Sequence, residues 1–372
     1  MNAYPAAAGY YGQALALWPD EDEARQQLLY RHAEALYIAN EEKALTALEE
    51  ARDAVLALGD GETAAQAELS IARLWWHRGQ RDKASAHESH AAELAGSEAS
   101  PATARVIAHV ARSRAIGGDS GEGLRLATEA LAMAEALDID ELRAHALTTI
   151  GLGKANLGNR AGIDDYERAL KIALAINSPQ VGTIINNIAV SDFFAFDFVR
   201  TDELFEEGQG LAERFGDAAG VRWLRAQRAG MAFMRGRWDD GLRQLDDFIA
   251  ECERGSPHYL EGRCHSDRAG IREGRGDLEG ALADYERSLA LARPAGDPQA
   301  LLPLLASAVA AFETHGRLDA ARLLAQELVD LAREHPFEAA IGLAFDFAYT
   351  RLATEFDREL REALDRAPPW PW

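Results

Sequence analysis

The sequence predicts an all-α protein, a right-handed superhelical solenoid of antiparallel helix pairs. Three observations predict this fold class. A glycine recurs about every 40 residues along much of the 372-residue chain. A second series of mostly small residues follows about twelve residues after it. No stretch alternates apolar and polar residues as a half-buried strand would, so we expect no sheet.

The glycine series marks a turn inside each repeat. Its members are separated by 39, 40, 78, 40 and 40 residues: Gly79, Gly118, Gly158, Gly236, Gly276 and Gly316. The gap of 78 is a double step with Phe196 in the skipped position. Glycine accepts the left-handed backbone of a tight turn. A fixed period of this length therefore predicts units of two helices, helix A before the turn and helix B after it.

The second series lies inside helix B, where small residues let neighbouring helices approach to roughly 8–10 Å. Its members are Ala14, Ala51, Ala91, Ala130, Ala169, Gly208, Phe248, Ser288 and Leu328. Short breaks such as "LGDGE", "NSPQ" and "AGDPQ" separate the units. Their Gly, Pro, Asp and Ser residues predict helix ends and N-caps.

The repeat register divides the chain into three parts. Residues 1–19, which include "AAAGYYGQALALWP", match only the helix B half of a unit. Residues 20–366 form an array of about nine helix pairs, and 367–372 form a C-terminal tail that we expect to be truncated. Solenoids normally protect their ends with capping units. We therefore expect a segment of a longer protein, whose first helix packs on the second unit alone or against another chain, and whose uncapped ends can self-associate.

Composition excludes several classes of function. The net charge is −22, and no run of Lys and Arg offers a nucleic-acid-binding face. No run approaches the ~18–20 apolar residues of a membrane span, and the N-terminus does not resemble a signal peptide. Two cysteines, Cys252 and Cys264, favour a reducing cytoplasm. Two buried thiols are favoured over a disulfide between adjacent helices.

These features resemble the tetratricopeptide repeat. Residues 276–292 carry its pattern through Gly276, Asp277, Ala281, Tyr285 and Ser288. The spacing of 38–40 residues is similar to that of a long-repeat subfamily. Segments such as "ALAMAEALDIDELRAHALTTIG" and "GLAERFGDAAGVRWLRAQRA" also resemble the C-terminal repeats of bacterial STAND/AAA-type signalling ATPases and nucleotide-cyclase-linked regulators. This resemblance implies a sensor or scaffold segment rather than a catalytic one.

A search for phosphate-binding chemistry finds no complete motif. Lys154 in "GLGKAN" lacks the earlier glycine and the following Ser or Thr of a Walker A loop, so Gly151 is interpreted as the small residue of a helix A. The glycine-rich segment 117–123 falls at a turn position and is interpreted as an ordinary turn. We expect no catalytic site and no cofactor.

Histidines and aromatic residues give two further candidates. His87 and His90 lie one helical turn apart, with His77 across the preceding turn, but polar helix faces are favoured over a zinc site. We expect no metal. In the segment "FFAFDF" (193–198), core packing is favoured over an aromatic binding wall or an altered turn.

In such arrays the stacked A helices line the concave face, which would hold a protein or peptide ligand. Counted from the turns, the candidate ligand residues are Tyr30, Arg73, Trp76, His109, Arg112, His145, Thr149, Asn186, Asn187, Phe193, Trp223, Gln227, Phe233 and Arg263. Asn186 and Asn187 are adjacent amides that would cost ~1–3 kcal/mol each if buried without partners. We expect one of them to bond to the neighbouring unit, and the alternative is a ligand-binding role for at least one of the two.

The carboxylate clamp of some tetratricopeptide domains can be tested by register. Its five positions fall at Thr148, Leu152, Asn187, Trp223 and Gln227, and only Asn187 agrees. The clamp is therefore rejected in these units.

The predicted function is a non-catalytic protein- or peptide-interaction and regulatory module of a cytoplasmic bacterial signal-transduction protein. Its partner would be a protein, a peptide or effector domains of its own longer chain. The alternative is a receptor for a small peptide or metabolite bound in the concave groove. A closed superhelix with a deep groove near Asn186 and Trp223 favours the receptor, and an open, shallow face favours the scaffold. An enzyme is the least favoured reading.

Overall fold

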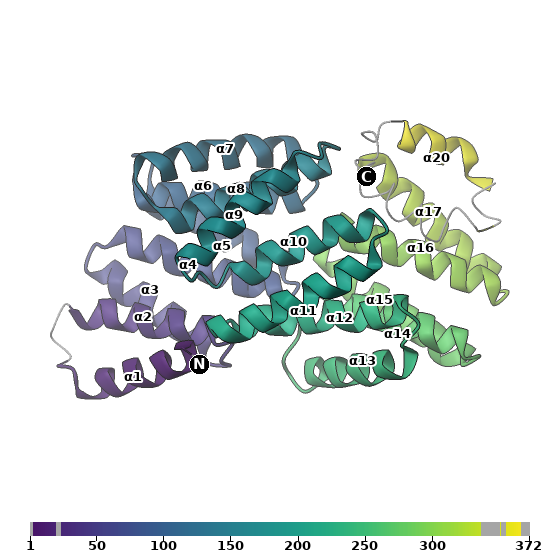
Figure 1. Cartoon of the computed structure of the whole chain (residues 1–372), viewed down its shortest axis with the longest axis horizontal. Helices are drawn as coiled ribbons and strands as arrows, with labels where there is room; N and C mark the ends of the chain where they lie inside the picture. Colours follow the sequence, from purple (N-terminus) through teal and green to yellow (C-terminus); the bar gives the residue numbers. More distant parts are fainter. Residues whose placement is uncertain (1–2, 20–23, 336–349, 351–354, 366–372) are drawn as a thin grey trace. The chain divides into compact units, whose positions relative to one another are not determined.

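The computed structural model describes residues 3–19, 24–335, 350 and 355–365 (Figure 1). Every regular element within these ranges is a helix, and none of them contains a strand, as the sequence predicts. α1 (Ala3–Leu17) precedes eight helix pairs that run from α2 to α17, and α20 (Asp357–Leu364) follows them. The predicted tail at 367–372 lies outside the described residues. None of the described helices combines the length and the apolarity needed to cross a bilayer.

Each pair consists of a helix A followed by a helix B. The pairs are α2 (Ala24–Ile38) and α3 (Ala44–Ala57), α4 (Gly61–His77) and α5 (Arg81–Ala95), α6 (Pro101–Ile116) and α7 (Ser120–Ala136), α8 (Asp140–Asn156) and α9 (Gly162–Ala175), α10 (Val181–Phe194) and α11 (Phe198–Phe215), α12 (Ala218–Met234) and α13 (Trp238–Glu253), α14 (Glu261–Gly274) and α15 (Leu278–Ala295), and α16 (Pro298–Thr314) and α17 (Leu318–Glu334).

The turns between helix A and helix B use left-handed backbone, as the glycine series predicts. All six glycines of that series have φ between 72° and 91°. Asn40 occupies the corresponding position between α2 and α3 with φ of 55°, and Phe196 occupies it between α10 and α11 with φ of 62°. The register read from the sequence is therefore confirmed, including the position where glycine is missing.

The prediction that Phe196 packs in the core is wrong. Its side chain is 57% exposed, and its ring meets Phe198 edge-on with the centroids 6.1 Å apart. The physical reason is the turn itself, because a left-handed apex residue lies between the two helices rather than on a packed face of either. The turn itself keeps the left-handed backbone of the other turns, with φ of 62° at Phe196.

The second series lies at the contacts between helices. Ala51, Ala91, Ala130, Ala169 and Leu328 are fully buried, and Phe248 and Ser288 are 1% exposed. At Gly208 an added Cβ would lie 3.0 Å from Cγ2 of Ile185. Eight of the nine members are therefore buried, as expected for positions at helix contacts, and Ala14 on α1 is half-buried.

Aspartates begin several of the helices. Asp60 Oδ1 accepts a hydrogen bond from the Thr63 amide at 3.0 Å, and Asp217 Oδ1 accepts one from the Gly220 amide at 2.8 Å. These N-caps satisfy backbone donors that the first helical turn leaves without partners. The polar breaks in the sequence therefore end one helix and begin the next.

Contacts between Cα atoms group the chain into two compact units. The first contains residues 1–115, 121–155 and 161–225, and the second contains 116–120, 156–160 and 226–372. In the first unit α1 packs against α2, and α3 packs against α4. Its N-terminal core is built around Leu48 and Ile71, which are fully buried.

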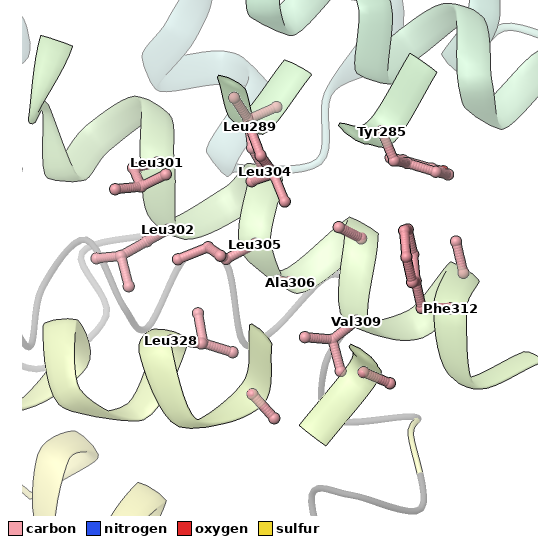
Figure 2. Close-up of a cluster of buried hydrophobic side chains, with 14 of the residues drawn as sticks. Tyr285, Leu289, Leu301, Leu302, Leu304, Leu305, Ala306, Val309, Phe312 and Leu328 are labelled. Carbon is pink, nitrogen blue, oxygen red and sulfur yellow. The ribbon is translucent and has the colours of Figure 1, made fainter. Parts of the chain in front are cut away.

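The core of the second unit lies between α15, α16 and α17 (Figure 2). Leu302, Leu305, Val309 and Leu328 have no exposed surface, and Phe312 is 6% exposed. Burying a side chain of this size contributes roughly 1.5–3 kcal/mol, so this cluster stabilises the pairing of the three helices.

Candidate functional site

The A helices of the first unit bring most of the candidate residues together. Trp76 on α4 and Trp223 on α12 are stacked, with ring centroids 5.8 Å apart and planes 18° apart. His77 meets both indoles edge-on, at 5.3 Å from Trp76 and 5.8 Å from Trp223. Side chains from helices of distant repeats therefore meet within this unit.

The two adjacent amides on α10 have different environments. Asn186 Oδ1 accepts a hydrogen bond from Trp223 Nε1 at 3.2 Å, so this residue bonds to the next repeat. Asn187 Nδ2 is buried and has no hydrogen-bond partner among the described residues. An unsatisfied buried donor costs about 1–3 kcal/mol, which a ligand acceptor would recover.

Two arginines occupy the same register position on successive A helices. Arg73 on α4 is exposed; its Nη2 lies 3.4 Å from Ser70 Oγ, and its guanidinium lies 5.4 Å from the centre of the Tyr37 ring. Arg112 on α6 is half-buried, and its Nη1 is buried without a hydrogen-bond partner in the described part of the chain. Burial lowers the pKa of Arg112, and Arg73 acts in the same direction while Tyr166 opposes it.

Histidines surround these cations. Burial lowers the pKa of His77 to about 4, and Arg73 adds to this effect. Burial also holds the pKa of His145 on α8 well below its usual value, and Arg112 contributes. Both rings are therefore neutral at pH 7. His109 Nε2 lies 3.0 Å from Glu88 Oε1, which gives this residue a carboxylate partner.

A pocket of about 440 Å³ adjoins this region between α1, α2 and α4. It is lined by Tyr4, Ala7, Tyr11, Gln27, Tyr30, Arg31, Glu34, Ala35, Thr63 and Gln66. Burial raises the pKa of Glu34 while Arg73 opposes the increase, so the carboxylate and the guanidinium interact electrostatically. The pocket and the arginine pair therefore belong to one region of the first unit.

Of the residues that line this pocket, the sequence analysis named Tyr30 as a candidate but not Tyr4, Tyr11 or Glu34. Tyr11 belongs to the segment that matches the helix B half of a unit, and it lines the pocket from α1. The half-repeat register of residues 6–19 was the signal that could have found it.

Other candidates lie elsewhere. Thr149 is fully buried and its hydroxyl donates to the His145 carbonyl at 3.2 Å, so it does not line the concave face. The Phe193 ring packs against Phe194 and Phe198, with centroid distances of 5.6 and 5.3 Å.

Three further candidates, Gln227, Phe233 and Arg263, belong to the second unit. There Arg263 Nε pairs with Asp267 Oδ1 at 2.9 Å, so its charge has a partner within its own helix. Phe233 packs so closely on Gly270 that an added Cβ would lie 2.7 Å from the ring.

The histidines considered for zinc bind a carboxylate. His87 Nδ1 donates to Glu68 Oε2 at 2.5 Å, and His90 Nδ1 donates to Oε1 at 2.9 Å. Arg52 Nη1 also donates to Glu68 Oε1, at 2.9 Å. His77 does not join this group, because its ring packs against Trp76 and Trp223. No group of three potential metal-binding side chains occurs within the described ranges.

The two glycine-containing segments that resemble phosphate-binding loops, at Lys154 and at 117–123, contribute to helix packing and to a turn. Lys154 Nζ pairs with Asp165 Oδ2 at 2.5 Å, and an added Cβ on Gly151 would lie 2.7 Å from the Tyr166 ring. Gly118 has φ of 91° in the turn after α6, and residues 120–123 are the first residues of α7. Cys252 and Cys264 are buried thiols rather than a disulfide, as expected.

No family model matches this sequence, and no curated protein matches it. Among solved structures, a Rap protein complexed with competence and sporulation factor is similar with a TM-score of 0.61 at 14% identity, over 91% of this chain and 98% of that one. Aspartyl phosphate phosphatase F from Bacillus subtilis is similar with a TM-score of 0.50 at 11% identity, over 88% of this chain and 89% of that one.

A signal transduction ATPase with numerous domains (STAND) from Pyrococcus horikoshii, which has a tetratricopeptide repeat sensor, is similar with a TM-score of 0.54 at 12% identity. The match covers 95% of this chain and 53% of that one. At these identities the likeness shows the fold. The tetratricopeptide-type solenoid predicted from the repeat is therefore confirmed.

Proposed function

We propose that this chain is a non-catalytic regulatory module that binds a small peptide on the concave side of its first unit. The observation that carries the proposal is the stack of Trp76 on Trp223. It brings two A helices from distant repeats within contact distance. A ligand beside this stack would be enclosed by protein on more than one side, as in ligand-sized sites, rather than held on a shallow face.

The surrounding groups suit a peptide. Trp76, Trp223 and Tyr30 offer rings against which apolar side chains can be desolvated. Asn187 Nδ2, which has no partner among the described residues, can donate to a peptide carbonyl. This combination supports a small peptide over a large folded partner.

Signalling is the biological role that we propose for this binding. One similar structure is a signal transduction ATPase with a tetratricopeptide repeat sensor, and another is a Rap protein complexed with competence and sporulation factor. We infer that peptide binding here regulates a cytoplasmic bacterial signal-transduction protein through contacts of the solenoid with its effectors.

The test is retention of peptides from a synthetic random heptapeptide pool by the purified chain, read by mass spectrometry after gel filtration. We expect a restricted set of sequences to be enriched. Asn187→Ala should weaken their binding about tenfold, since one charge-neutral hydrogen bond is lost. Gln209→Ala changes an amide that bonds to Glu213 on α11 and is the matched control. No enrichment, or equal binding by Asn187→Ala, would contradict the proposal.

The pocket between α1, α2 and α4 supports a second candidate, a small metabolite. Its volume of about 440 Å³ lies in the range of small-molecule sites, and three tyrosines line it. Mass spectrometry of the denatured protein would identify a co-purifying compound. Tyr11→Ala should lose that compound, and its retention would remove this candidate.

A further inference from the structure

We propose that Arg73 and Arg112 form a binding site for an oxyanion of the ligand, a carboxylate or a phosphate. This inference rests on the proposed function, because it assumes that the ligand occupies the concave side of the first unit. It adds the chemical class of the ligand, which must carry a negative charge.

The first argument is position. Arg73 and Arg112 are separated by one repeat and lie on the consecutive A helices α4 and α6. Packed helices in such arrays lie roughly 8–10 Å apart, a separation that two arginine side chains can bridge around one oxyanion. The Arg73 guanidinium is close enough to Arg112 to contribute to the lowering of its pKa.

The second argument is the missing partner. Neither arginine forms an ion pair within the residues that the structure describes, and Arg112 Nη1 is buried without a hydrogen bond. Two half-buried arginines elsewhere are paired, Arg52 with Glu68 at 2.9 Å and Arg268 with Asp284 at 2.6 Å. Burying a cation without a counter-charge costs free energy, so Arg112 is a candidate for a functional role.

The third argument is charge. The chain has 61 acidic and 39 basic residues, so a surface picked at random would be acidic. Glu34 and Glu141 act on Arg73 and raise its pKa, but neither forms an ion pair with it within the described residues, and Glu88 lies 3.0 Å from His109. Two cations without ion-pair partners attract an anion in preference to a neutral competitor.

Neighbouring side chains complete the site. Tyr166 and His145 both interact electrostatically with Arg112. The ring nitrogens of His145 form no hydrogen bond within the described residues, although its backbone carbonyl accepts one from Thr149. The neutral imidazole and the phenol can donate hydrogen bonds to an oxyanion beside the two guanidinium groups.

The experiment measures anion binding by the purified chain at constant ionic strength, with potassium chloride as the reference salt. Inorganic phosphate and succinate are titrated separately by isothermal calorimetry. We expect at least one of them to bind, and Arg112→Gln and Arg73→Gln to weaken that binding at least tenfold. Arg114→Gln changes an exposed arginine at the end of the same helix α6 and should bind as the unmodified chain does.

The two anions identify the source of the charge. Preference for phosphate indicates a phosphorylated ligand, and preference for succinate indicates carboxylates such as acidic side chains. No binding beyond that of chloride, or equal binding by Arg112→Gln, would overturn the proposal.

A stability measurement separates binding from folding. Arg112→Met removes an unpaired buried charge and keeps most of the side-chain volume, so the ligand-free Tm should rise. A fall in Tm would show that Arg112 is part of the fold and would overturn the proposal. If the heptapeptide pool is retained equally by Arg112→Gln, the anion site fails and the proposed function remains. If anions bind but no peptide is enriched, the anion site stands and the proposed function fails.

Discussion

Phe196 occupies a backbone position that glycine fills at six other turns. An L-residue in left-handed conformation costs roughly 1–2 kcal/mol, and a large aromatic ring is an unusual choice there. The contact of the Phe196 ring with Phe198 offsets part of this free-energy cost. The sequence therefore tolerates local strain at the turn between α10 and α11.

Phe196→Gly should raise the free energy of unfolding by about 1 kcal/mol, because glycine accepts φ of 62° without strain. Urea denaturation measures the change. Gly236→Ala is the reciprocal control: no atom lies within 4 Å of the added Cβ, so its expected loss of about 1 kcal/mol comes from backbone strain. A less stable Phe196→Gly variant would show that the ring contact outweighs the strain.

Asp217 is a buried N-cap at the start of α12. Burial raises its pKa to about 6, although the hydrogen bond from the Gly220 amide opposes the shift. Its pKa is thus higher in the folded chain than in the unfolded one. The stability that it contributes is present below pH 3.8 and is lost as the pH rises through 6.

Asp217→Asn should therefore stabilise the chain by about 2 kcal/mol at pH 7.5, since asparagine also caps helices and carries no charge to desolvate. Urea denaturation at pH 7.5 and pH 4 measures the effect, and the gain should shrink at the lower pH. Asp197→Asn changes an exposed cap of α11 and should alter stability little. A gain that does not depend on pH would contradict this explanation.

At the scale of helices, Glu68 joins three of them. Its carboxylate on α4 accepts from Arg52 on α3 and from His87 and His90 on α5, and it has no exposed surface. Burial raises the pKa of Glu68, but the hydrogen bonds from His87 and Arg52 outweigh it and hold the pKa below its usual value. The carboxylate therefore remains charged where it is most enclosed.

Glu68→Gln should destabilise the chain by about 3 kcal/mol, because it leaves a cation and two imidazoles around a neutral amide. Thermal unfolding, monitored by circular dichroism, would measure this loss of stability. Glu93→Gln, on the exposed surface of α5, is the matched control and should change Tm little. Equal melting of both variants would show that the network contributes nothing.

At the scale of the whole molecule, charge is the dominant global property. A net charge of −22 produces repulsion that destabilises the folded chain and that added salt screens. Tm should therefore rise between 20 and 200 mM potassium chloride. A falling Tm would show that the attractive ion pairs outweigh the repulsion.

The repeat fold could be predicted because its signals are local. Gly79 and Gly118 mark left-handed turns, and Ala91 and Ala130 mark close helix contacts, each within one unit of about 40 residues. Asp217 and Asp60 begin helices by accepting hydrogen bonds from amides three residues away. Such features depend on backbone geometry and on adjacent helices, so the amino-acid sequence alone determined the helices, their turns and their pairing.

The candidate site depended on tertiary structure. The sequence placed Trp76 and Trp223 on concave A helices but could not bring them together, because that contact depends on small rotations accumulated over several repeats. The packing of the repeats also determines that Arg112 has no carboxylate partner among the described residues and that Thr149 is buried. It likewise determines that a pocket lies beside Tyr11. The sequence determined which side chains line the A helices, and only the tertiary structure decided which of them meet and which remain unpaired.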